Sequence, residues 1–74
     1  MKTNRFEEAK AKLLGIMASL FDRTVKENEI DTLSTVLWEQ ENFLEEDYGV
    51  TTEEILEIED YFWGNCKNYK IIPA

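Results

Sequence analysis

Apolar residues recur every three or four positions between residues 6 and 20, which is the spacing of one face of an α-helix. The stripe consists of Phe6, Ala9, Leu13, Ile16, Met17 and Leu20. Asn4 precedes Glu7 by three residues, as in a capping box, where the two side chains satisfy free amides at the helix start. The pattern therefore predicts a first helix over residues 4–23.

A second stripe of the same period predicts a helix over residues 28–48. Its core positions are Ile30, Leu33, Leu37 and Leu44, with Val36 and Phe43 on one flank. Thr24 and Glu27 offer an earlier capping pair for this helix. Gly49 can adopt the left-handed conformation that ends a helix at little cost. We therefore expect Val50 to fold back onto Leu44.

The third helix has the strongest start signal. Thr51 and Glu54 have the spacing of a capping box, and Val50 with Ile55 fits the hydrophobic staple around it. The helix face consists of Ile55, Ile58, Phe62, Cys66 and Tyr69. A helical Gly64 costs roughly 1 kcal/mol relative to alanine. The helix therefore either ends at residue 64, leaving an irregular tail over 65–74, or continues from residue 52 to 69.

The connections near residues 24–27 and 49–50 are short, which favours antiparallel neighbours. We therefore expect an all-α fold, a single small three-helix bundle, forming one acidic helical domain over residues 1–74. A chain of 74 residues lies near the lower limit for independent folding. With one cysteine and no histidine, it can form neither an intrachain disulfide nor a Cys/His zinc site.

Positive and negative residues are separated along the chain. Residues 1–26 carry a net charge of +3, residues 27–66 carry −13 without any Lys or Arg, and residues 67–74 carry +2. Helices usually mix the signs, because Glu–Lys pairs four residues apart stabilise them by about 0.2–0.5 kcal/mol and like pairs cost as much. Glu41–Glu45 and Glu53–Glu57 instead repeat like charges at that spacing. The acidic block indicates either a binding surface or a device for solubility alone.

Carboxylates three or four residues apart on a helix lie about 5–6 Å from each other, which approaches the spacing of backbone phosphates. Such a surface can occupy the basic groove of a nucleic-acid-binding enzyme, as small acidic inhibitors of phages and mobile elements do. The likeness is one of charge character. We predict a protein-binding inhibitor whose charged surface comprises Glu39, Glu41, Glu45, Glu46, Asp47, Glu53, Glu57 and Asp60.

Two tryptophans lie outside the core stripes. Trp38 falls among Ser34, Glu41 and Glu45, and Trp63 forms a second stripe with Leu56, seven residues earlier. Buried Trp residues commonly anchor interfaces. Alternatively, both rings fill a second seam of the bundle, since each helix meets two neighbours. If the rings do not fill such a seam, Trp38 and Trp63 are the predicted apolar contacts with a partner.

The first helix has small residues opposite its apolar stripe. They are Ala11, Gly15, Ala18 and Ser19. A helix with little polar cover is usually buried, and small residues four apart permit close helix contact. Three interpretations remain open, namely a central helix, a homodimer seam or a partner seam. In the second, Ala11, Gly15 and Ser19 carry self-association, and the protein is a structural or adaptor module.

The chain lacks the side chains of most catalytic and metal sites. Without histidine no group titrates readily near neutral pH, and Cys66 has no partner to activate it. Aligning Gly49 or Gly64 with the glycine of an EF-hand loop puts Leu44 or Tyr61 at ligand positions. We therefore expect no enzyme activity, no cofactor and no metal.

The charge and hydropathy of the chain limit which molecules it can bind and in which compartment we expect it. The −13 block opposes direct binding to nucleic acid or to a membrane surface. The longest uncharged stretch, Leu13–Phe21, has nine residues, whereas about 20 are needed to span a bilayer. No secretory signal is visible either, so we expect a cytoplasmic protein.

Overall fold

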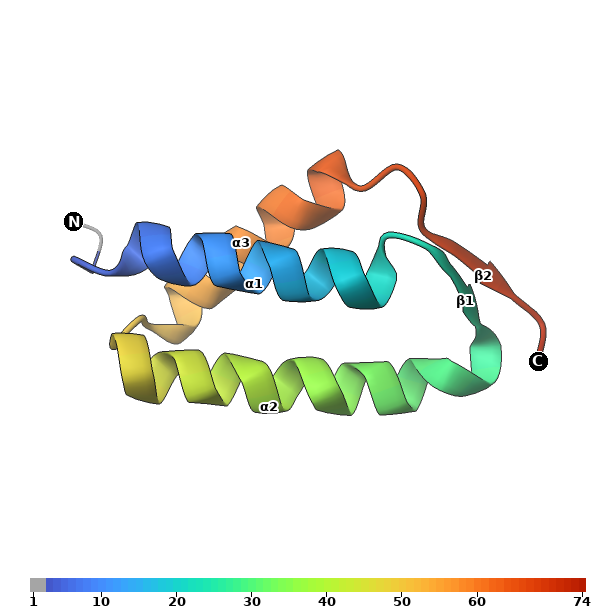
Figure 1. Ribbon diagram of the computed structural model, residues 1–74, viewed down its shortest axis with the longest axis horizontal. Helices are drawn as coiled ribbons and strands as arrows, with labels where there is room; N and C mark the ends of the chain where they lie inside the picture. Colours follow the sequence, from blue (N-terminus) through green and yellow to red (C-terminus); the bar gives the residue numbers. More distant parts are fainter. Residues whose placement is uncertain (1–2) are drawn as a thin grey trace.

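The computed structural model describes residues 3–74, which form three helices and a small strand pair (Figure 1). The elements in chain order are α1 Phe6–Phe21, β1 Thr24–Lys26, the 3₁₀ helix η1 Glu27–Glu29, α2 Ile30–Tyr48, α3 Thr52–Asn65 and β2 Lys70–Ile72. α1 and α2 run antiparallel and side by side, while α3 starts beside the end of α2 and crosses α1 diagonally (Figure 1). The fold is therefore mostly helical, as expected, but not all-α.

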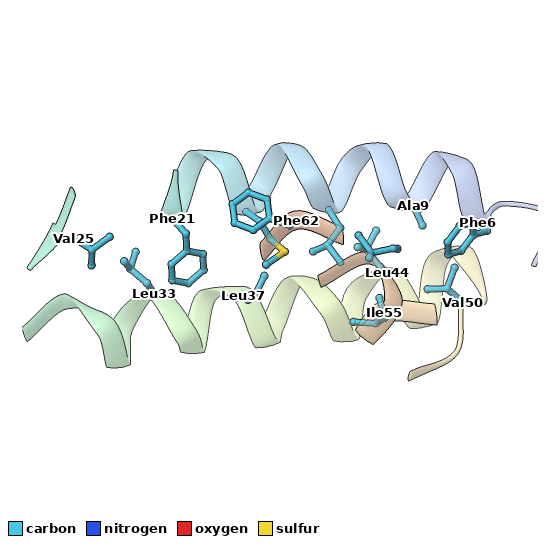
Figure 2. Close-up of a cluster of buried hydrophobic side chains, with 13 residues drawn as sticks. Phe6, Ala9, Phe21, Val25, Leu33, Leu37, Leu44, Val50, Ile55 and Phe62 are labelled. Atoms are coloured by element: carbon cyan, nitrogen blue, oxygen red, sulfur yellow. The ribbon is translucent and has the colours of Figure 1, made fainter. Parts of the chain in front are cut away.

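A single apolar core runs along the molecule between the helices (Figure 2). Its largest fully buried side chains are Leu13, Met17, Leu44, Ile58 and Val25. The predicted stripes supply most of it, although Ile16, Leu20 and Ile30 are only half-buried. Phe6 and Val50 close one end, and Val25 with Leu33 closes the other (Figure 2). Helical period therefore identified the core faces correctly.

The helix ends agree with the sequence in part. Gly49 ends α2 in the left-handed conformation, with φ of 70°, and Thr51 with Glu54 forms the predicted capping box of α3. The predicted box of Asn4 and Glu7 is wrong. α1 begins at Phe6, whose N–H donates to Thr3 O at 2.9 Å, so a turn of backbone takes the place of the side-chain cap.

The start of α2 was also predicted wrongly. Thr24 does not cap a helix, because it lies in β1, whose central residue Val25 is fully buried. The Lys26 N–H instead donates to Glu29 Oε2 at 3.0 Å and opens the 3₁₀ turn before Ile30. Because Val25 is buried in an extended segment, α2 starts two residues later than predicted.

The two strands overturn the irregular tail and the alternative helix to residue 69. α3 passes through Gly64 and ends at Asn65, and Lys70–Ile72 then pairs in parallel with Thr24–Lys26. The Asn68 N–H donates to Asp22 Oδ1 at 3.2 Å, and the Tyr69 ring packs edge-on against Phe21. Strands of three residues, 46 positions apart, leave no periodic signal in the sequence.

α1 packs closely against both α2 and α3. Its small residues nevertheless stay at the surface, because the two neighbours cover the opposite face. Ala11, Gly15, Ala18 and Ser19 are all exposed. The interpretation that a central position buries this face is therefore wrong. Within residues 3–74, no helix is long and apolar enough to cross a membrane.

Candidate functional site

The predicted acidic surface is divided by the fold into separate sets. Glu39 and Glu46 lie seven residues apart on the outer face of α2, opposite its core stripe, and both are exposed. Glu53 and Asp60 have the same relation on the outer face of α3. These four carboxylates point away from the core on two different helices.

The other predicted acidic residues lie on different sides. Glu41 and Glu45 are half-buried on the side of α2 that meets α3. Asp47 is exposed at the end of α2, where its carbonyl oxygen accepts a 2.9 Å hydrogen bond from Arg5, the residue before α1. Glu57 is exposed on α3. The structure therefore does not gather the eight predicted carboxylates into one continuous surface.

Two polar contacts join α2 to α3. The Thr52 hydroxyl donates to Glu45 Oε1 at 2.9 Å, and Glu41 forms a side-chain hydrogen bond with Glu59. Glu41 Oε2 is buried and has no hydrogen-bond partner among the described residues. Two ionised carboxylates cannot hydrogen-bond each other, so this contact favours the protonated form of Glu41.

The electrostatics of Glu41 follow from this geometry. Burial raises its pKa from the usual 4.5 to about 8, and the hydrogen bond with Glu59 and the charges of Glu59 and Glu45 act in the same direction. Such a perturbed carboxyl is a feature of functional sites as well as of strained packing. It marks the contact of α2 with α3 as the most unusual electrostatic environment of the described chain.

Three large apolar side chains surround this contact. Trp38 lies three residues before Glu41 and seven before Glu45, on the same side of α2. Leu56 and Trp63 flank Glu59 on α3, three residues before it and four after it. Because Glu41 bonds Glu59 and Glu45 bonds Thr52, these two helix sides face each other. We call this surface the α2–α3 face; it consists of Trp38, Glu41, Glu45, Thr52, Leu56, Glu59 and Trp63.

The two tryptophans differ in their packing. Trp38 is 63% exposed, so it is a surface residue and not part of a second seam. Trp63 is 42% exposed, and its ring centroid lies 5.4 Å from that of Phe21 and 5.1 Å from that of Tyr69. Trp63 therefore packs against Phe21 and Tyr69 with one part of its ring and leaves another part at the surface.

A second candidate surface lies on the opposite flank of α2. An open groove of about 550 Å³ runs between α1 and α2. It is lined by Ala11, Lys12, Gly15, Ile16, Ser19, Leu20, Val36 and Gln40. The structure thus brings the three predicted self-association residues together in one groove, the α1–α2 groove. The exposed Phe43 lies three residues beyond Gln40 on the same side of α2.

The cations of α1 contact aromatic rings and nearby acids. The Arg5 guanidinium lies 4.0 Å from the Tyr48 ring centroid, and the Lys10 ammonium lies 4.4 Å from that of Tyr61. Ion pairs within residues 3–74 join Arg5 to Glu8 at 3.1 Å and Arg23 to Glu29 at 3.7 Å. Neither pair involves a carboxylate of α2 or α3, so these pairs leave the charge of those helices in place.

Comparison with known proteins adds no further information on the site. No protein-family model, curated protein or solved structure matches this chain. Within residues 3–74, no group of three or more Cys, Asp or Glu side chains is placed to hold a metal ion. Function must therefore be argued from the geometry of these two surfaces.

One important residue was absent from the predicted surface. Glu59 was not among the predicted acids, yet it is the partner of Glu41. Its position between Leu56 and Trp63 on their stripe was a usable signal, since residues three and four apart share a helix side. Val36 and Gln40, in contrast, gave no such signal in the sequence. They line the α1–α2 groove because α2 packs on α1.

Proposed function

We propose that this protein is a small cytoplasmic binding module that docks its acidic helices on the basic, nucleic-acid-binding site of a partner protein and inhibits it. The observation that carries the proposal is the exposure of Glu39, Glu46, Glu53 and Asp60. None of these four carboxylates forms an ion pair with another residue of the described chain, 3–74. A surface of this kind attracts a basic partner over a distance set by the ionic strength.

The packing of α1 supports this proposal. Its cations could have compensated the acidic helices, but two of them lie over the rings of Tyr48 and Tyr61. Burial raises the pKa of Glu41, and the hydrogen bond with Glu59 and the repulsive charges of Glu59 and Glu45 raise it further. A protein selected only for stability would mix charges on these helices. Retention of the repulsion is consistent with a partner that supplies the positive charge.

The test is a capture experiment from a nuclease-treated bacterial lysate at low salt, with competitor DNA added to displace the bound protein. For the captured partner, Glu53→Lys with Asp60→Lys should weaken binding by more than tenfold at low salt, and the difference should shrink at high salt. Glu7→Lys with Glu8→Lys is the matched control, because it reverses two exposed carboxylates on α1. Equal affinity of all variants, or a partner that DNA does not displace, would remove the proposal.

The α1–α2 groove favours a second candidate, a structural or adaptor module that self-associates through α1. The exposed Ala11, Gly15 and Ser19 line an open groove, which a second copy could fill. A Cβ added at Gly15 meets no atom within 4 Å, so Gly15→Leu should fold normally and block the groove. Sedimentation equilibrium should then show a wild-type dimer and a monomeric variant. A wild-type protein that stays monomeric at high concentration argues against this candidate.

A further inference from the structure

The α2–α3 face exposes large apolar side chains that are not part of the core. Trp38 and Leu56 are 63% and 54% exposed, and neither belongs to the buried core. They lie on facing sides of two helices, beside the contact of Glu41 with Glu59. Contiguous exposed apolar side chains bordered by polar ones mark interaction sites. These residues therefore indicate a surface that a partner covers.

The least covered residues of the core lie on α2 and α3. α3 starts beside the end of α2 and moves away from it toward the far side of α1 (Figure 1). The three most exposed residues of the core are Leu33, Leu37 and Phe62, at 8%, 9% and 7%. Leu33 and Leu37 belong to the part of α2 from which α3 has departed. An apolar partner side chain would complete the cover at that position.

The charged residues beside these apolar residues along α2 and α3 are all negative. Glu41 and Glu45 follow Trp38 on α2, and Glu59 lies between Leu56 and Trp63 on α3. Residues 27–66 contain no Lys or Arg at all. The complementary occupant must therefore present apolar and cationic side chains at short intervals. A nucleic acid, with its phosphates, is excluded by charge, and an apolar helix would leave the carboxylates without partners.

A basic amphipathic helix meets both requirements. Its residues three and four positions apart share one side, so one strip can carry Leu or aromatic side chains and the adjoining strips Arg or Lys. Many nucleic-acid-binding proteins contact their targets through a basic helix. Arg is the better cation here, because its planar guanidinium can bond two carboxylate oxygens at once and also stack on an aromatic ring.

We infer that the α2–α3 face binds a basic amphipathic helix of a partner protein, with Trp38 and Leu56 contacting its apolar strip and Glu41, Glu45 and Glu59 contacting its arginines. The inference rests on the proposed function and adds the form of the partner's basic site. It distinguishes the two surfaces of the molecule, because the one charged residue among those lining the α1–α2 groove, Lys12, would repel such a helix.

The experiment measures fluorescence anisotropy of labelled synthetic peptides titrated with the full chain. The first peptide has about 18 residues, five helical turns, with Leu on one side and Arg on the other. The second has the same composition in an order that destroys the helical period. The third is an oligolysine of equal charge, which tests attraction by charge alone.

The amphipathic peptide should bind at least tenfold more tightly than the other two. Trp38→Ala with Leu56→Ala should reduce its affinity by at least tenfold, since buried Trp residues commonly dominate interfaces. Glu7→Gln with Glu8→Gln, which removes two exposed carboxylates on α1, is the control and should change the affinity less than threefold. Both substituted apolar residues are exposed, and thermal melts should confirm that the variants remain folded.

The possible results separate this inference from the proposed function. Equal binding of all three peptides, unaffected by Trp38→Ala and Leu56→Ala, would overturn the α2–α3 face as the site while leaving an acidic binding module in place. A failure of every basic peptide to bind at low salt would overturn the inference and also remove the support for the proposed function. Loss of binding with Glu39→Gln and Glu46→Gln, but not with Trp38→Ala and Leu56→Ala, would place the site on the outer face of α2 and overturn the inference.

Discussion

Two glutamates at the contacts of α3 have opposite properties. Glu54, at the start of α3, accepts hydrogen bonds from the Thr3 hydroxyl at 2.5 Å, the Thr3 N–H at 2.8 Å and the Thr51 N–H at 2.9 Å. These donors, the Thr3 hydroxyl first, lower its pKa to about 2. Glu41, one side of the contact between α2 and α3, faces Glu59 and Glu45, and burial with these neighbours raises its pKa to about 8.

The difference shows that the surroundings of a carboxyl, and not its burial alone, decide its state. Glu54 is as buried as the core residue Leu33, at 8%, yet it is held ionised because every nearby polar group donates to it. At Glu41, burial and the neighbouring carboxyls of Glu59 and Glu45 favour the protonated form instead. The first contact closes the fold by tying residue 3 to α3. The second contact, between α2 and α3, brings carboxyl groups close together at a surface, where a cation could replace the proton on Glu41.

The largest effect is expected from Glu54→Ala. This substitution removes the three hydrogen bonds of the carboxylate and half of the capping box at once. It should lower the melting temperature more than Thr51→Ala does, since Thr51 provides a single cap worth about 1 kcal/mol, or about 4–8 °C in a small domain.

Circular dichroism melts of both variants check this order. Glu53→Ala, at an exposed neighbouring position, serves as the control and should change the melting temperature little. A smaller loss of melting temperature for Glu54→Ala than for Thr51→Ala would mean that the hydrogen bonds from Thr3 contribute nothing to stability. The surroundings of Glu54 would then not stabilise the fold, contrary to the comparison with Glu41.

A medium effect is expected on the pH dependence of stability. Because Glu41 binds its proton more tightly in the folded state, the free energy of unfolding should fall as the pH rises from about 4.5 to about 8. Because Glu54 binds its proton less tightly when folded, stability should fall as the pH drops from about 4.5 to about 2. The maximum should therefore lie near pH 4.5.

Glu41→Gln isolates the alkaline side of this profile. The amide imitates the protonated carboxyl and can donate to Glu59, so the variant should lose much less stability than the wild type between pH 5 and pH 8, a difference of several degrees in melting temperature. Glu39→Gln removes the same charge from the outer face of α2 and should leave the wild-type slope. Parallel profiles for wild type and Glu41→Gln would contradict the raised pKa.

The smallest effect is expected from salt. Moderate NaCl screens the repulsion among exposed carboxylates of α2 and α3 and should raise the melting temperature of the wild type by a few degrees at neutral pH. Glu53→Lys with Asp60→Lys should reduce this increase, whereas Glu7→Lys with Glu8→Lys should not. A melting temperature that falls with added salt would show that the pairs Arg5–Glu8 and Arg23–Glu29 outweigh the repulsion.

The predictable part of the fold is the part that local interactions control. The capping box of Thr51 and Glu54 lies within four residues, and the left-handed Gly49 responds to a single backbone position. The core stripes of the helices follow from helical period alone. The strands at Thr24–Lys26 and Lys70–Ile72 depend on a contact between distant segments, and the sequence between them contains no trace of it.

The candidate site shows the same division. Trp38 and Trp63 were identified because they fall outside the core stripes, and the acidic block is visible as a simple run of charge. The grouping of the carboxylates was not visible. Glu39 and Glu41 are two residues apart in the chain, but helical rotation puts one on the outer face and the other against Glu59.

The sequence by itself determined three amphipathic helices, their core faces, two of their ends and a forty-residue block without positive charge, because period, capping and composition act over a few residues. Only the tertiary structure decided which sides of α2 and α3 meet, that Glu41 lies against Glu59, and that the small residues of α1 remain in an open groove. These features depend on the angle at which α3 crosses α1, which arises from the packing of side chains distant in the chain.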